Sequence, residues 1–384
     1  MIKKEHIPYV AGGVAAMVAG GLALSLVDGG TDKVQEADQL PSSDELRSGP
    51  KPLRVMVSGA GGQIAYSLLP LIANGYVFGT KQRVFISMLD IPPAMQVLEG
   101  VRMELEDGAY PLLAGVSASA DPKEALKNAD VAVFVGGFPR RQGMLRKDLI
   151  EKNCHIFKAQ GKALEEVASK SVKVLVVANP ANTNCLILKK NAPSIPSENF
   201  TCLTRLDSNR AKSQIALKAR VNPSDVYNVT IWGNHSATQY PDAMNGYLIR
   251  NNVRKTIPEV ITDTAWLRGS FISTIQQRGK AIIDARKLSS AMSAANAIGN
   301  HLRSWLVTGT KEGETISMGV WSNGNPYGVR DGLIFSFPLE VKTPGRYTIA
   351  SGFEIDSFAN TKIRSSEAEL LEELAVAESI LRSS

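Results

Sequence analysis

The fold is decided by the stretch LRVMVSGAGGQIA, which runs from Leu53 to Ala65. Residues 53–58 form a short, apolar run, as expected for a strand that is buried on both faces. The run leads into a glycine-rich turn at residues 59–62 and then into a helical pattern over residues 63–73. Small residues in such a turn let the backbone approach a pyrophosphate at the positive end of the helix. The stretch therefore predicts a nucleotide-binding turn, although a glycine-rich turn alone is a weak signal.

A carboxylate follows the next predicted strand, residues 83–89. Asp90 at this place can accept hydrogen bonds from both hydroxyls of an adenosine ribose, and its charge repels the 2′-phosphate of NADP. It lies 28 residues after Gly62, whereas the motif usually has roughly 20, and the loop at residues 74–79 explains the excess. NAD is therefore the expected cofactor. An ordinary Asp that caps the next helix is the alternative.

The same alternation continues along the chain. Further strands are predicted at residues 131–135 and 172–177, and helices at residues 63–73, 95–106 and 148–168. This order predicts right-handed βαβ units and an α/β fold, a Rossmann-type doubly wound parallel sheet.

The pattern changes after about residue 204, and a mixed α+β catalytic domain is expected to follow the parallel sheet. Long helices are predicted at residues 266–286 and 290–306, and short strands at 226–232, 315–321 and 333–337. An amphipathic helix closes the chain. The predicted divisions are an N-terminal segment and linker at residues 1–52, an NAD-binding domain at residues 53–203, and a substrate domain at residues 204–384.

Charge and cysteine content exclude several classes of protein. The 384 residues carry a formal net charge of +6; the first 52 carry −2, so residues 53–384 carry +8. This basic part has no run of Lys and Arg interleaved with aromatic residues, so no nucleic-acid partner is expected. The 3 cysteines include no CxxC pair, which excludes a disulfide framework and a structural zinc site. No metal is expected.

The N-terminus is a candidate for membrane contact. Residues 7–27 are almost entirely apolar and follow Lys3 and Lys4. This length is close to the roughly 20 residues that span a bilayer, and a removable presequence fits equally well. A poorly ordered tail is the alternative. Residues 28–52 have the polar composition of a linker.

Charged residues with possible chemistry occur at three further places. Arg140 and Arg146 lie in a loop after the predicted strand 131–135, where they could grip carboxylates beneath a mobile lid or simply form a solvated loop. Asp207 and Arg210 share a helix face and could form only an intrahelical ion pair. His235 ends a strand and could be structural. Together, however, they suit hydride transfer, in which a His takes a hydroxyl proton and a carboxylate steadies the imidazolium.

From about Leu53 onward the chain resembles the malate dehydrogenases of the type usually found in the cytosol, a branch of the lactate/malate dehydrogenase family. Six motifs carry the resemblance in the same order over about 330 residues. They are GAGGQIAYSLL from Gly59, LDIPPAM from Leu89, PRRQGMLRKDL from Pro139, NPANTNCL from Asn179, CLTRLDSNRA from Cys202 and IWGNHSATQYPD from Ile231.

The resemblance implies a role for each matching residue. His235 would be the proton acceptor and Asp207 its partner. Arg210 would hold the carboxylate beside the reacting carbon, Arg140 would bind the distal one, and Arg146 and Asn179 would also contact substrate. NAD would be held by Gly59, Ala60, Gly61, Gly62, Gln63, Ile64, Ala65, Asp90, Asn153, Gln160, Val177, Ala178 and Asn179.

Arg140 distinguishes among the relatives that the resemblance suggests. Similar lactate dehydrogenases have a Gln there, because pyruvate carries a methyl group, and a buried Arg facing a methyl group would stay unpaired. Malate and oxaloacetate are therefore the expected substrates. The resemblance also implies a homodimer. The rival hypotheses are a dehydrogenase for another 2-hydroxy acid and a catalytically idle NAD-binding scaffold tethered by its N-terminus. The location stays open, because the body resembles cytoplasmic enzymes while residues 7–27 suggest organellar targeting or membrane association.

Overall fold

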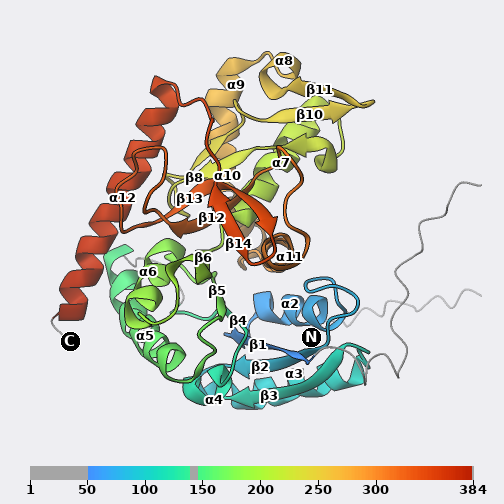
Figure 1. Ribbon diagram of the computed structural model, residues 1–384, viewed down its shortest axis with the longest axis vertical. Helices are drawn as coiled ribbons and strands as arrows, with labels where there is room; N and C mark the ends of the chain where they lie inside the picture. The colour runs from blue at the N-terminus through green and yellow to red at the C-terminus, as the bar shows by residue number, and fades with distance from the viewer. Residues whose placement is uncertain (1–50, 139–145, 383–384) are drawn as a thin grey trace, which may run out of the picture. The chain divides into compact units, whose positions relative to one another are not determined.

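The computed structural model describes residues 51–138 and 146–382. Its main element is a nine-stranded sheet in the order β14-β13-β12-β6-β5-β4-β1-β2-β3 (Figure 1). Six strands run parallel: β1 (Leu53–Ser58), β2 (Val84–Leu89), β3 (Leu113–Ser119), β4 (Val131–Phe134), β5 (Lys173–Val176) and β6 (Phe200–Cys202). Their order, 3-2-1-4-5-6, is that of the doubly wound dinucleotide-binding fold. The predicted fold class is confirmed.

Helices cover both faces of the parallel strands. On one face lie α2 (Gln63–Ala73) and α3 (Met95–Asp107), and on the other α4 (Pro122–Leu126), α5 (Arg146–Val167) and α6 (Ala181–Asn191). Side chains of β1 point alternately to the two faces of the sheet. Val55 and Val57 pack in the core with α2 and α3, and Met56 packs in the core with α5 and α6. Because both faces are buried, the strands read as continuous apolar runs in the sequence. Short 3-10 helices occupy Pro92–Ala94, Ser197–Asn199 and Pro223–Asp225.

Three antiparallel strands extend the same sheet beyond β6. They are β12 (Ile316–Trp321), β13 (Ile334–Thr343) and β14 (Arg346–Ile349), and β12 pairs with β6 through Gly319 and Cys202. A Cβ on Gly319 would lie 2.1 Å from the Sγ of Cys202, so this close pairing requires glycine. The sequence predicted the first two strands but not that they join the parallel sheet.

The other strands of the described residues form two small sheets. One contains β7 (Val226–Tyr227), β10 (Tyr247–Arg250) and β11 (Val253–Thr256), and the other pairs β8 (Thr230–Trp232) with β9 (Tyr240–Asp242). The prediction of one strand over residues 226–232 is therefore wrong. Asn228 has a positive φ of 53°, a left-handed conformation that breaks the strand and sends its two parts into different sheets.

The remaining helices follow the C-terminal half of the chain. They are α7 (Arg205–Ala219), α8 (Ile257–Val260), α9 (Thr264–Arg268), α10 (Ser270–Arg286), α11 (Met292–Arg303) and α12 (Ser357–Arg382). The helix predicted at 266–286 is interrupted at Gly269, whose ψ of −98° is not helical. After α11 the helix widens into a π-helical turn, Ser304–Thr308.

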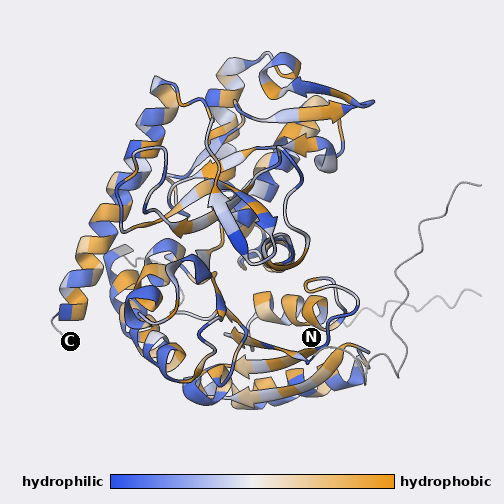
Figure 2. Ribbon diagram, in the orientation of Figure 1, coloured by the Kyte–Doolittle hydropathy of each residue, from blue (hydrophilic) through white to orange (hydrophobic). Residues whose placement is uncertain are grey.

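Helix α12 belongs to two cores. Ala359, Ile363 and Leu370 pack in the core of the C-terminal half, whereas Ala377, closer to the end of the helix, packs in the core that contains α5 and α6. Figure 1 shows α12 passing from the C-terminal elements alongside α6 and α5. Its bands of alternating hydropathy in Figure 2 are those of a helix with one apolar face.

The N-terminal predictions fall outside the described residues. Residues 7–27 are not among them, nor is the linker predicted at residues 28–52 except for its last two residues. Within residues 51–138 and 146–382, no helix is both long enough and apolar enough to cross a membrane.

Candidate active site

The glycine-rich turn lies where β1 meets α2. Gly59 has a positive φ of 64°, and a Cβ there would lie 2.5 Å from the Cα of Gly136 after β4, so the two strand ends approach too closely for a side chain. Gly62 caps α2 without any side-chain hydrogen bond, and no acidic residue lies in the first turn of the helix. Backbone amides of that turn are left without an intrahelical acceptor. This geometry suits a pyrophosphate.

Asp90 lies beside the same turn. Its Oδ2 accepts a hydrogen bond from the Gly61 amide at 2.9 Å, and its Oδ1 accepts one from the Ile91 amide at 2.8 Å. A carboxylate can accept about four hydrogen bonds, so capacity remains for two ribose hydroxyls. The long spacing in the sequence therefore does not prevent the acid from reaching the turn, and the residues present fit a dinucleotide.

Asn153 joins the loops that follow β4 and β5. It is fully buried, its Oδ1 accepts a hydrogen bond from the Phe138 amide at 2.8 Å, and its Nδ2 donates to the carbonyl oxygens of Leu149 at 3.0 Å and Asn179 at 3.3 Å. Asn153 thus fixes the backbone on which Asn179 lies. A direct contact between Asn153 and NAD stays a prediction.

The other predicted cofactor residues lie near the same sheet edge or on α5. Val177 and Ala178 follow β5, and the Asn179 side chain beyond them is exposed. Gln160 lies on α5, nearly buried, and its Oε1 has no hydrogen-bond partner among the described residues. An orphaned buried oxygen is unusual in a folded protein, so a polar ligand at this position would satisfy it.

The structure brings Asp207, Arg210 and His235 together. Asp207 lies in the first turn of α7 and is fully buried, whereas His235 follows β8 in the connection to β9. The Nδ1 of His235 lies 2.5 Å from the Oδ2 of Asp207. Arg210 donates to the other carboxylate oxygen at 3.1 Å and to the Ser290 hydroxyl at 3.2 Å. One carboxylate therefore serves an imidazole and a guanidinium at once.

The environment keeps Asp207 ionised. Burial alone would raise the pKa of this carboxyl group, but His235 and Arg210 together hold it below its usual value. An anionic Asp207 accepts a hydrogen bond from Nδ1–H and fixes the tautomer of the ring. Nε2 is then the nitrogen that can take up or release a proton, as in other His–Asp pairs. The His235 side chain is 18% exposed and that of Asp207 is 0% exposed, so within this pair the imidazole is the group that a substrate can reach.

Sequence reasoning missed the residues that hold the His235 loop. The amide of His235 donates to the Oδ1 of Asn182 at 2.9 Å, and the amide of Asn234 donates to the Ser366 hydroxyl at 2.8 Å. Asn182 belongs to the NPANTN motif, which gave a signal for the segment but not for this residue. Ser366 lies on α12, and no motif or spacing indicated it.

Arg140 lies outside the described residues, and Arg146 begins α5, but its side chain also lies outside them.

No metal site is evident in the described ranges, where no group of three or more His, Cys, Asp or Glu side chains could hold an ion.

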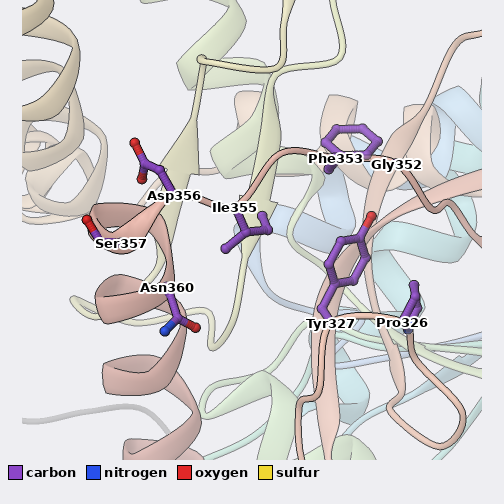
Figure 3. A pocket seen from close by; sticks show the side chains of 8 residues that line it. All are labelled: Pro326, Tyr327, Gly352, Phe353, Ile355, Asp356, Ser357 and Asn360. Atoms are coloured by element: carbon purple, nitrogen blue, oxygen red, sulfur yellow. The ribbon is translucent and has the colours of Figure 1, made fainter.

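A separate hollow of about 470 Å³ lies at the start of α12. Figure 3 shows Asp356, Ser357 and Asn360 at one end of it and Tyr327 and Phe353 at the other. None of the candidate site residues lines it. We therefore do not assign it to the site.

Comparison with known families decides the family. Residues 53–201 match the family model described as lactate/malate dehydrogenase, NAD binding domain, and residues 204–380 match that of the lactate/malate dehydrogenase alpha/beta C-terminal domain. The chain belongs to the lactate/malate dehydrogenase family. Among curated family members, it is 54% identical to the cytoplasmic malate dehydrogenase of Beta vulgaris, over 86% of this chain and 99% of that one. It is 55% identical to that of Rattus norvegicus, over 87% and 99%.

The solved structures that the chain resembles include both malate dehydrogenases and lactate dehydrogenases. The malate dehydrogenase of Naegleria fowleri aligns with a TM-score of 0.81 and 44% identity, over 86% of this chain and 99% of that one. The lactate dehydrogenase of Trichomonas vaginalis in complex with NADH and oxamate aligns with a TM-score of 0.83 and 38% identity, over 86% and 100%. Since both align well, the fold alone does not choose between the substrates.

Proposed function

We propose that the chain is an NAD-dependent malate dehydrogenase, which interconverts malate and oxaloacetate. The observation that carries this proposal is the contact of the Asp207 carboxylate with both His235 and Arg210. It provides a proton acceptor and a carboxylate-binding cation side by side. The high identity to curated malate dehydrogenases supports the choice of substrate.

In malate oxidation, the Nε2 of His235 accepts the proton of the substrate hydroxyl while a hydride leaves the carbon that bears this hydroxyl. Asp207 stabilises the imidazolium that forms. Arg210 binds the carboxylate next to the reacting carbon, Arg140 binds the distal carboxylate, and Arg146 and Asn179 orient the substrate. Bound NAD supplies the acceptor of the hydride. In the reverse direction, the imidazolium returns its proton to the carbonyl oxygen of oxaloacetate.

Residues near the parallel strands hold the cofactor in this proposal. The turn from Gly59 to Ala65 binds the pyrophosphate and Asp90 binds the adenosine ribose. The remaining contacts are assigned to Asn153, Gln160, Val177, Ala178 and Asn179. The orphaned Oε1 of Gln160 and the exposed side chain of Asn179 support this assignment.

The test follows NADH absorbance with oxaloacetate and with pyruvate. We expect kcat/KM to be at least ~100-fold higher for oxaloacetate, because only its second carboxylate pairs with Arg140. Equal use of pyruvate would favour a different 2-hydroxy acid. NADH binding without turnover of either keto acid would favour the idle scaffold. Arg140→Gln should lower the oxaloacetate-to-pyruvate ratio, and an unchanged ratio would contradict the role of Arg140.

We also propose that the chain forms a symmetric homodimer. Large apolar side chains are exposed on helices from both halves of the chain, namely Val97 and Met103 on α3, Leu217 on α7 and Met292 on α11. Interfaces between subunits bury exposed apolar side chains, and symmetric dimers are the commonest soluble oligomers. Light scattering after size exclusion should give the mass of two chains; a single-chain mass at every concentration would contradict the dimer.

For residues 7–27, we propose a role in targeting or membrane association. Their apolar character behind Lys3 and Lys4 supports it. N-terminal sequencing of the mature protein and membrane fractionation of expressing cells test it. A shortened N-terminus or a membrane-bound full chain is expected. Full-length chain found only in the soluble fraction would contradict it.

A further inference from the structure

The loop that carries His235 is held by α12. This loop, residues 233–239, connects β8 to β9. Its first contact is at Asn234, which is fully buried. The Nδ2 of Asn234 donates to the Oε2 of Glu369 at 2.9 Å and to the Oε1 of Glu373 at 2.8 Å. Two carboxylates, one helical turn apart on α12, therefore hold the residue immediately before His235.

The residues after His235 reach the same carboxylate. The Thr238 hydroxyl donates to the Oε2 of Glu369 at 2.5 Å, and the Ser236 hydroxyl donates to this oxygen as well. Ser236 and Thr238 also contact each other at 3.0 Å. One oxygen of Glu369 thus accepts hydrogen bonds from residues on both sides of His235. These contacts hold the two ends of the loop together at one point on α12.

This arrangement suits a carboxylate, because all three groups donate to the same oxygen. A carboxylate has only acceptor positions, whereas an amide of the same shape presents one oxygen and one NH₂ group. Hydrogen bonds to a charged acceptor are roughly twice as strong as those between neutral groups. A glutamine at residue 369 can place its amide oxygen where Oε2 lies, but this neutral acceptor would weaken all three contacts.

The helix that carries Glu369 is itself fixed. Leu370 packs in the C-terminal core and Ala377 in the core with α5 and α6. Glu373 also accepts a hydrogen bond from the Thr183 hydroxyl on α6, the helix that begins two residues after Asn179. The helix therefore ties the His235 loop to the segment that follows β5.

We infer that Glu369 is a positioning residue for the reaction, which acts through the loop to hold the imidazole of His235 against Asp207. The inference rests on the proposed role of His235 as the proton acceptor. Glu369 touches neither substrate nor cofactor in this account. Its effect is on the chemical step, because a displacement of about 1 Å in a catalytic group can cost on the order of 100-fold in rate.

The test compares Glu369→Gln with Glu372→Gln. Glu372 lies on the same helix and is exposed, so its replacement removes the same charge without touching the loop. We expect Glu369→Gln to lower kcat roughly 10- to 100-fold and to leave the Kd for NADH within about twofold. Glu372→Gln should match the wild type. An unchanged kcat in Glu369→Gln, or an equal loss in both variants, would overturn the inference.

A double variant separates this inference from the proposed function. If Glu369 acts through His235, Glu369→Gln should cost nothing further in a His235→Asn background, because coupled residues are non-additive. The same fold-loss in both backgrounds would overturn the positioning role. Near-normal turnover of His235→Asn alone would instead contradict the proposed function and the inference with it.

A milder variant covers the case in which Glu369→Gln does not fold. Thr238→Val keeps the shape of the side chain and removes one of the three donors. We expect kcat to fall about threefold to tenfold with an unchanged Kd for NADH. An unchanged kcat would contradict the proposal that the hydrogen bonds to Glu369 position His235.

Discussion

The carboxylate of Asp207 faces two positive groups, with one oxygen toward His235 and the other toward Arg210. A single buried acid in this position steadies the proton acceptor and also orients the cation that binds substrate. Neither neighbour can be moved without affecting the other. The residue therefore couples proton transfer to substrate binding.

Asp207 should make the fold sensitive to acid. Its pKa lies below the ordinary value because His235 and Arg210 outweigh burial, so the ionised form stabilises the fold above the unfolded-chain pKa of about 3.9. This contribution disappears as the pH falls through the lower folded pKa. Urea unfolding of the wild type and Asp207→Asn should give a difference in the free energy of unfolding that shrinks between pH 5 and pH 3. A constant difference would refute this expectation.

Asp90 should decide cofactor choice. Replacing Asp90 with Ser removes the charge that repels a 2′-phosphate, and two like charges near a protein surface oppose each other by about 1–4 kcal/mol. We expect Asp90→Ser to raise the ratio of kcat/KM for NADPH to that for NADH about 10-fold or more. Asp107→Ser, which removes an exposed acid from the end of α3, is the control. No gain for Asp90→Ser would show that another group discriminates.

At the scale of elements, the β8–β9 connection depends on one glycine. Gly233 precedes Asn234, has a positive φ of 94°, and exchanges backbone hydrogen bonds with Ser336 of β13. A Cβ at Gly233 would lie 2.1 Å from the Ser366 hydroxyl oxygen. Glycine therefore allows α12 to approach the backbone closely enough to hold the loop.

Gly233→Ala should damage both stability and turnover. The left-handed backbone and the clash with Ser366 together should cost about 2–4 kcal/mol in the free energy of unfolding. The displaced loop should also lower kcat. Gly279→Ala in α10 is the matched control, since nothing lies within 4 Å of its added Cβ, and it should be neutral or slightly stabilising. Equal effects of the two changes in thermal melts and assays would contradict this interpretation.

The elements that the sequence predicted are those with strong local patterns. Strands β1 and β2 are apolar runs and α2 has helical periodicity, so local composition was enough. Strand β3 was missed because its residues, LAGVSAS, are small and mostly half-buried at the sheet edge. The joining of β12 to β6 was also missed, because pairing between distant segments leaves no periodic signal.

The sequence also predicted only part of the candidate site. Asp207, Arg210 and His235 lie in short motifs, and the structure brings them together. Glu369 and Ser366 were not found, because they lie on an ordinary amphipathic helix more than 130 residues beyond His235. Such residues reach the site only through the three-dimensional fold, so their spacing in the sequence does not indicate them.

At the scale of the whole molecule, residues 51–384 should work without the N-terminus. Strand β1 begins at Leu53, and the family match begins at the same residue. We expect a variant that lacks residues 1–50 to keep kcat/KM for oxaloacetate within about twofold and its Tm within about 2 °C. A large loss in either measurement would show that the N-terminal residues contribute to the folded body.

Because α12 contributes side chains to two separate cores, the two halves of the described chain should not melt one after the other. Opening either core would strip apolar surface from the shared helix and expose the second core as well. We therefore expect one heat-absorption peak in calorimetry, shifted as a unit by NADH. Two resolved peaks would show that the halves lose their structure independently.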